Sequence, residues 1–180
     1  MFDTDLSIDS QVPMTRSTAP ETPQPWGDED SERRKTPVFE DECGLYALTE
    51  VKKRDKNAFT VNYDDMTASD YYYKLKKCAA NSCGYQGGAM AASEMLVVGK
   101  KYGLLTGMNM FGGDTRPADY FADEANRNKA MIVCFQKDGR DHYAKIDEIS
   151  INSGVITYRD SDGSGSISMD KIQGVMYNDK

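Results

Sequence analysis

The sequence predicts an α+β domain that follows a disordered N-terminal segment. Three observations lead to this prediction. Proline, serine, threonine and acidic residues dominate the first 36 residues, and apolar side chains recur at helical spacing from residue 43 to about residue 126. After residue 128, apolar and polar side chains alternate between glycine-containing turns, which is typical of antiparallel strands. Helices followed by hairpin-connected strands indicate a helical half and a sheet half.

The composition excludes several function classes. A length of 180 residues suits one domain, and four cysteines are too few for a disulfide framework, so we expect free thiols. Twenty-nine acidic and 22 basic side chains give a net charge of −7, which argues against broad binding to nucleic acids or anionic membranes. No apolar run approaches the roughly 20 residues that span a bilayer.

Residues 1–36 are expected to form a disordered polar tail, and residues 37–180 the domain. Five of the six prolines lie at or before Pro37. The N-terminus lacks the basic and apolar regions of a Sec signal peptide. A polar start rich in Ser, Thr and Pro, without such a signal, resembles the secretion segments of bacterial effectors. A plain solvated tail is the alternative.

Four helices are expected in the first half of the domain. Leu45, Leu48 and Val51 predict a helix over 43–54, and Thr67 is a candidate cap for a second helix over 68–77. Residues 78–88 form a predicted glycine-rich loop, followed by a helix over about 89–102 with Gly103 as its C-cap. A fourth short helix is predicted over 115–126.

The second half is expected to be an antiparallel meander. A buried strand over 130–135, a turn at Asp138-Gly139 and an alternating strand over 142–150 come first. A hairpin turn over 152–154 leads to a strand over 155–159, a loop over 160–166 and a last segment ending at Tyr177.

The chemistry centres on His142, the one histidine of the chain, which opens a predicted strand. The next strand ends at Asp160, so a tight hairpin places the two side chains together. Histidine is the usual general base near neutral pH, and a neighbouring carboxylate fixes its tautomer. Cys43 begins the first helix, where the helix dipole and a histidinium both favour a thiolate nucleophile.

This order of Cys43, His142 and Asp160 resembles the papain-like cysteine proteases, in particular their compact bacterial branch. The stretches carrying the resemblance are Cys43-Gly-Leu-Tyr-Ala-Leu, His142-Tyr-Ala and Asp160-Ser-Asp-Gly. The resemblance covers about residues 38–177. It implies a papain-like α+β fold, in which a helical half with the nucleophile helix packs on an antiparallel sheet half, and a catalytic triad of these three residues.

The sequence departs from the family in three respects. The family's oxyanion Gln before the cysteine has no counterpart, which leaves the oxyanion donor unknown, with Asn57, Asn62 or a backbone N–H as candidates. Asp41 and Glu42 are acidic neighbours that would raise the pKa of the Cys43 thiol. Asp162 stands where the family has tryptophan.

Cys83 is the alternative nucleophile. It precedes a predicted helix and is followed by glycine, which resembles the start of the bacteriocin-leader peptidase domains. The structural alternatives are that buried cysteines such as Cys134 are inert and that His142 only packs. Residues 160–168 also mimic a calcium loop, but Lys171 stands where a bidentate Glu is required. We therefore expect no metal and no cofactor.

The sequence thus predicts a cysteine protease that acts on protein substrates, secreted without a Sec signal as an effector and acting in the cytosol of a target cell. An inhibitor, immunity or chaperone protein is a possible partner, whereas nucleic acid and membrane are not expected. A glutamine deamidase using the same triad, a non-catalytic papain fold that binds a partner and a calcium-tuned binding module are the alternatives.

Overall fold

A computed structural model of the chain describes residues 42–54 and 68–180. The expected tail over 1–36, Asp41 and the candidate oxyanion donors Asn57 and Asn62 lie outside the described residues. The helices are α2 (Cys43–Arg54), α3 (Ala68–Cys83), α4 (Ala92–Lys101), α5 (Pro117–Phe121), α6 (Glu124–Lys129) and the 3-10 turn η2 (Met169–Lys171). The strands are β2 (Gly107–Met110), β3 (Ala130–Lys137), β4 (Arg140–Ser150), β5 (Val155–Asp160), β6 (Gly163–Ser168) and β7 (Ile172–Tyr177).

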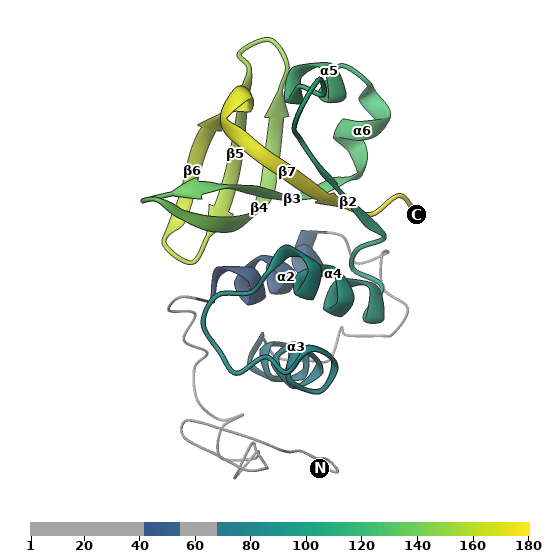
Figure 1. Cartoon of the computed structure of the whole chain (residues 1–180), viewed down its shortest axis with the longest axis vertical. Helices are drawn as coiled ribbons and strands as arrows, with labels where there is room; N and C mark the ends of the chain where they lie inside the picture. Colours follow the sequence, from purple (N-terminus) through teal and green to yellow (C-terminus); the bar gives the residue numbers. More distant parts are fainter. Residues whose placement is uncertain (1–41, 55–67) are drawn as a thin grey trace.

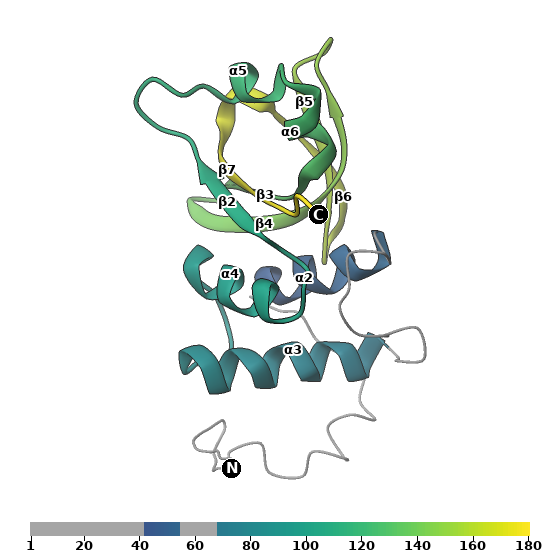
Figure 2. The same cartoon turned by 90° about the vertical axis from the view of Figure 1, so that its right-hand side faces the viewer.

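The fold is α+β, as expected. The six strands form one antiparallel sheet in the order β2-β7-β3-β4-β5-β6. Helices α2 and α4 lie side by side beneath the sheet, and α3 lies beneath them (Figure 1). The sheet is strongly curled, and the short helices α5 and α6 lie at one end of the curl (Figure 2).

The helical layer follows the expected apolar spacing, with one correction. Helix α2 spans the predicted residues 43–54 and buries Leu45, Leu48 and Val51 completely. Helix α3 continues six residues beyond the predicted end at Lys77, because Cys78 and Ala79 extend its buried face. The predicted start of the glycine-rich loop at residue 78 is therefore wrong. The helix ends only before Gly84, whose φ of +71° suits glycine.

Three further predictions need correction. The predicted helix over 115–126 is two helices, because the Asp123 side chain accepts a hydrogen bond from the Ala125 N–H (3.0 Å) and caps a new helix there. The predicted loop over 160–166 is a tight turn followed by β6, which pairs with β5 along its whole length. Strand β2 was not predicted, and it adds an edge strand beside β7.

The sheet separates two hydrophobic cores. Residues 130–135 of β3 are all buried, because alternate side chains enter different cores. Ile132 and Cys134 pack with the helices, whereas Val133 and Phe135 pack inside the curl of the sheet. The same alternation sends Tyr143 of β4 towards the helices and Ala144 into the curl. Burial on both faces fixes the register of β3 and β4.

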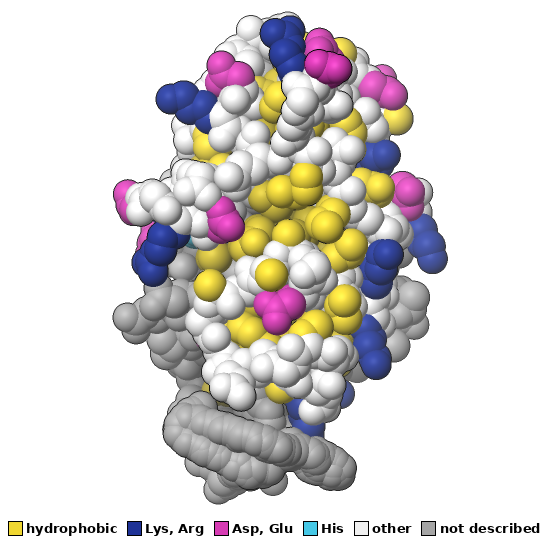
Figure 3. Space-filling model, in the orientation of Figure 1, with side chains coloured by type: hydrophobic (Ala, Val, Ile, Leu, Met, Phe, Trp, Pro, Cys, Tyr) yellow, Lys and Arg dark blue, Asp and Glu magenta, His cyan; other side chains and the backbone are white. Residues whose placement is uncertain are grey.

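Apolar side chains also reach the surface. Figure 3 shows hydrophobic groups gathered in the middle of the face that it presents. The exposed large hydrophobic side chains of the described residues are Val97, Met110 and Ile151. In the part of the chain that the structure describes, no helix combines the length and apolar character needed to cross a membrane.

Helix α4 packs tightly at Gly99. A Cβ atom built there would lie 2.5 Å from Cδ1, 2.7 Å from Cγ and 2.9 Å from Cβ of Leu105. We expect Gly99→Ala to lower the free energy of unfolding by about 1–3 kcal/mol, because the overpacked core must shift. Urea denaturation measures this, with the exposed Ser93→Ala in the same helix as control. Equal stability of the two variants would contradict the packing described here.

Candidate active site

His142 and Asp160 are brought together where β4 begins and β5 ends, as the hairpin predicts. His142 lies near the start of β4, and its Nε2 atom is 2.8 Å from Oδ2 of Asp160 at the end of β5. The imidazole ring also meets the Phe135 ring edge-on, with centroids 5.2 Å apart. These contacts hold the ring through Nε2 and leave Nδ1 on the side away from Asp160.

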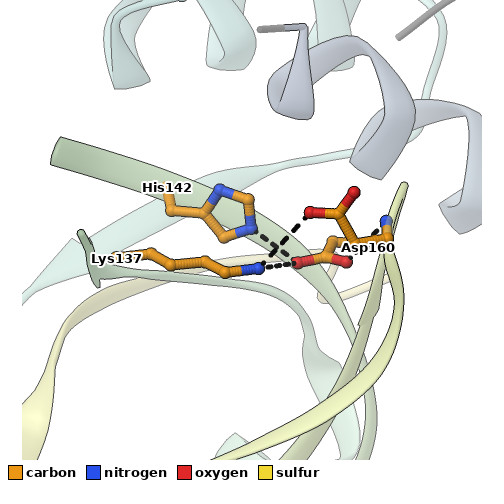
Figure 4. A network of polar contacts seen from close by, with 4 residues as sticks. Lys137, His142 and Asp160 are labelled. Atoms are coloured by element: carbon orange, nitrogen blue, oxygen red, sulfur yellow. Dashed lines mark hydrogen bonds and ion pairs between the residues drawn. The ribbon is translucent and has the colours of Figure 1, made fainter. Parts of the chain in front are cut away.

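Asp160 is a buried carboxylate with three donors. Its side chain is 2% exposed, and its Oδ2 accepts hydrogen bonds from His142 and from Nζ of Lys137 (3.0 Å), while Oδ1 accepts one from the Asp162 N–H (2.9 Å). Figure 4 shows Lys137 and His142 converging on this carboxylate from neighbouring strands. Burial alone would raise the pKa of Asp160, but the hydrogen bonds outweigh it, and the pKa lies below its ordinary value.

Cys43 is the first residue of α2, and the helix N-terminus packs against β4. The Cys43 thiol lies next to the Tyr143 backbone, which forms a hydrogen bond with it. Tyr143 directly follows His142 on β4, and Cys43 and His142 both line one cavity. The sequence-predicted Cys43, His142 and Asp160 therefore gather in one region, between the helical layer and the end of the sheet.

A cavity of about 830 Å³ opens at this place. Cys43 and His142 both line it, together with Met90 from the segment before α4. The end of β3 contributes Lys137, and the turn between β5 and β6 contributes Asp162. The cavity is large enough to hold several side chains or a segment of extended chain, with the thiol and imidazole both on its wall.

The environment of Cys43 favours the neutral thiol. Burial is the main cause that raises its pKa, and the negative charge of Asp160 raises it further. Hydrogen bonds from the backbone of Tyr143, Gly44 and Cys43 itself act in the opposite direction but do not outweigh burial. The net pKa lies above the ordinary value, so the thiol is protonated near neutral pH in the protein without a ligand.

Glu42, expected to act on the thiol, has its own partners. Its side chain accepts hydrogen bonds from the hydroxyls of Tyr72 (2.6 Å) and Tyr85 (3.2 Å), and it forms an ion pair with Lys76 (3.1 Å). These partners lie in α3 and the glycine-rich loop. Glu42 is not among the main causes of the pKa shift of Cys43, and its buried side chain ties the start of α2 to the helical layer.

The structure does not bring Cys83 to the site. It is the last residue of α3 rather than a residue before a helix, because α4 begins only at Ala92. The C-terminal end of a helix dipole disfavours a thiolate, and burial together with Glu94 raises the pKa of Cys83. Cys134 does line the cavity, but burial raises its pKa to about 12.

Lys137 is the site residue that the sequence analysis missed. Alternation along β3 and β4 puts Phe135, Lys137 and His142 on one face of the hairpin, because Phe135 pairs with His142. Counting residue pairs outward from the Asp138-Gly139 turn would have placed Lys137 on the same face as His142. A surface lysine beside a turn carries no other signal in the sequence.

Residues 160–168 do not form a calcium loop. Asp160 faces His142 and Lys137, and the residues after the turn belong to β6. Across residues 42–54 and 68–180, no group of three or more His, Cys, Asp and Glu side chains is arranged to hold a metal ion.

Comparisons with protein-family models, with curated proteins and with solved structures find no match for this chain.

The Asp160 network has a consequence for acid stability. Because the pKa of Asp160 is lower in the folded state, its contribution to stability is present above about pH 4 and is lost as the pH falls through the folded-state value. We expect Asp160→Asn to be less stable than wild type at pH 7 and to lose less stability between about pH 5 and pH 2. Urea denaturation between pH 2 and pH 7 measures the free energy of unfolding of both proteins. An equal loss of stability in wild type and Asp160→Asn as the pH falls would contradict the stabilising role of the Asp160 carboxylate.

Proposed function

We propose that this protein is a papain-like cysteine protease with Cys43, His142 and Asp160 as its catalytic triad. One observation carries the proposal. A cysteine at a helix N-terminus and a histidine held by a buried aspartate line the same cavity. This combination supplies a nucleophile, a general base and an orienting carboxylate in a place that can hold a peptide.

The proposed reaction is acyl transfer to sulfur. Cys43 Sγ attacks the carbonyl carbon of the scissile amide, while the thiol proton passes to Nδ1 of His142, which Asp160 holds through Nε2. The tetrahedral intermediate then breaks its C–N bond, and His142 delivers the proton to the leaving amine. Water, deprotonated by His142, hydrolyses the acyl-thioester and regenerates the thiol.

The raised pKa of Cys43 determines how the first step proceeds. The thiol is neutral in the resting protein, so His142 removes its proton as the carbon–sulfur bond forms. The oxyanion is assigned to backbone N–H groups at the start of α2, because the N–H groups of Cys43 and Gly44 point at the Cys43 thiol and take no part in the hydrogen bonds between turns of the helix. This assignment replaces the glutamine that the family places before its cysteine.

The proposal includes delivery as an effector and a protein substrate in the cytosol of a target cell. Its support is the polar, proline-rich composition of residues 1–36 and the resemblance to the compact bacterial proteases. An inhibitor, immunity or chaperone protein covering the cavity would keep such an enzyme inactive where it is made.

Thiol alkylation tests the Cys43–His142 pair without a known substrate. We expect iodoacetamide at pH 7.5 to modify Cys43 about tenfold more slowly in His142→Ala than in wild type, since general-base assistance is worth 10²–10⁴ in favourable cases. Peptide mass mapping follows all four thiols in one sample. Cys83 is the internal control, and its rate should not change. An unchanged Cys43 rate in His142→Ala would sink the proposed pair.

Activity is tested on an unfolded protein substrate. We expect wild type to produce peptide fragments, and Cys43→Ser to reduce cleavage to the background, because the nucleophile is lost. Cys83→Ser should retain activity. Intact substrate in which glutamine side chains have become glutamate would contradict a protease and identify a deamidase with the same triad. Equal cleavage by wild type and Cys43→Ser would contradict both.

A further inference from the structure

We propose that Lys137 is a positioning residue of this site, whose ammonium group holds and compensates the charge of the Asp160 carboxylate that orients His142. The inference rests on the proposed function, in which Cys43 and His142 react together. It concerns a side chain that the papain-like resemblance does not assign.

Lys137, the last residue of β3, reaches the Asp160 carboxylate at the end of β5. Its Nζ atom lies 3.0 Å from Oδ2 of Asp160, the same oxygen that His142 contacts at 2.8 Å. Lys137 is also 3.7 Å from the Asp162 carboxylate, which is well exposed to solvent. One carboxylate oxygen thus receives two donors, and the lysine leaves it little freedom to turn away from the imidazole.

Charge compensation at Asp160 matters to the thiol. Asp160 acts on Cys43 through space and raises the pKa of the thiol. A lysine bound to the carboxylate opposes this effect, because a distant thiol then faces a nearly neutral pair. Lys137 therefore lets a buried carboxylate orient His142 without a full penalty on the nucleophile.

Other ionisable groups surround the thiol and set the background for this effect. On the sheet side they are Cys134 of β3 and Asp141, His142 and Tyr143 of β4. On the helical side, Tyr85 and Glu94 lie near the cluster.

The turns at the cavity rim add Asp138, Arg140 and Asp162. Of the groups named around the thiol, Lys137 is the cation bonded directly to Asp160. A change confined to Lys137 therefore isolates the compensation.

The test is the pH midpoint of Cys43 alkylation, measured in the full-length protein with iodoacetamide and peptide mapping. We expect Lys137→Met to raise this midpoint by about 0.5 unit, which is roughly a threefold loss of thiolate at a fixed pH below the midpoint. Lys137→Arg keeps the charge and should keep the wild-type midpoint. The matched control is Lys145→Met, which removes the lysine of another Lys–Asp pair of the same sheet (2.7 Å to Asp147) outside the cavity lining.

A double variant separates charge from structure. If Lys137 acts by compensation, Lys137→Met combined with Asp160→Asn should return the midpoint towards wild type, because both opposite charges are gone. A merely structural lysine would give a double variant that is no closer to wild type than Lys137→Met. That result, or an unchanged midpoint in Lys137→Met, would overturn the inference.

The two proposals fail in different ways. The midpoint of Cys43 can be measured whether or not His142 assists the thiol. If Lys137→Met shifts the pH midpoint of Cys43 alkylation but His142→Ala leaves the alkylation rate unchanged, the electrostatic role of Lys137 stands and the proposed enzymatic function is contradicted. If His142→Ala strongly slows Cys43 alkylation but Lys137→Met leaves the pH midpoint unchanged, the proposed Cys43–His142 pair stands and the role of Lys137 is contradicted.

Discussion

The burial of β3 and β4 on both faces is the constraint on which the site depends. Strand residues alternate between the core shared with the helices and the core inside the curl. Tyr143 therefore faces the start of α2, and its backbone reaches the Cys43 thiol. His142, one residue earlier, is on the other face with Phe135 and contacts Asp160 at the end of β5. A slip of one residue in the register would exchange these two faces and separate the imidazole from its carboxylate.

Two buried carboxylates lie close to Cys43, one in the chain and one in space, and their charges have different partners. Glu42 precedes Cys43 directly, but two tyrosine hydroxyls and Lys76 hold its charge within the helical layer. Asp160 is distant in sequence, yet its charge reaches the thiol. Sequence distance is therefore a poor guide to electrostatic effect. Neither buried carboxylate is left unpaired, because each contacts a lysine and accepts hydrogen bonds from two further groups. The free-energy cost of burying each charge is thereby reduced.

The sequence predicted those parts of the fold that depend on local periodicity. The bounds of α2 and the hairpin of β3 and β4 were found because apolar spacing and the Asp138-Gly139 turn specify them. Strands β2 and β6, the two edge strands of the sheet, were missed. Strand β6 is rich in glycine and serine, which have little strand preference, and β2 pairs with β7, which is distant in sequence. The meeting of His142 and Asp160 followed from hairpin geometry. Lys137 did not, because its partner is a carboxylate on a third strand.

The protonation state of the Cys43 thiol depends on its burial at the cavity and determines what the proposed reaction requires of His142. Cys43 lies on the wall of the cavity that the proposed peptide substrate would enter, and its burial there raises the pKa of its thiol. In the proposed reaction, a substrate that excludes more water would favour the neutral thiol still further, so the proposal does not rely on a thiolate formed in advance. In the proposed reaction the proton therefore leaves as the carbon–sulfur bond forms, and the proposed rate depends on how firmly His142 is held. His142 is held by its contact with Oδ2 of Asp160, an oxygen that also accepts a hydrogen bond from Lys137.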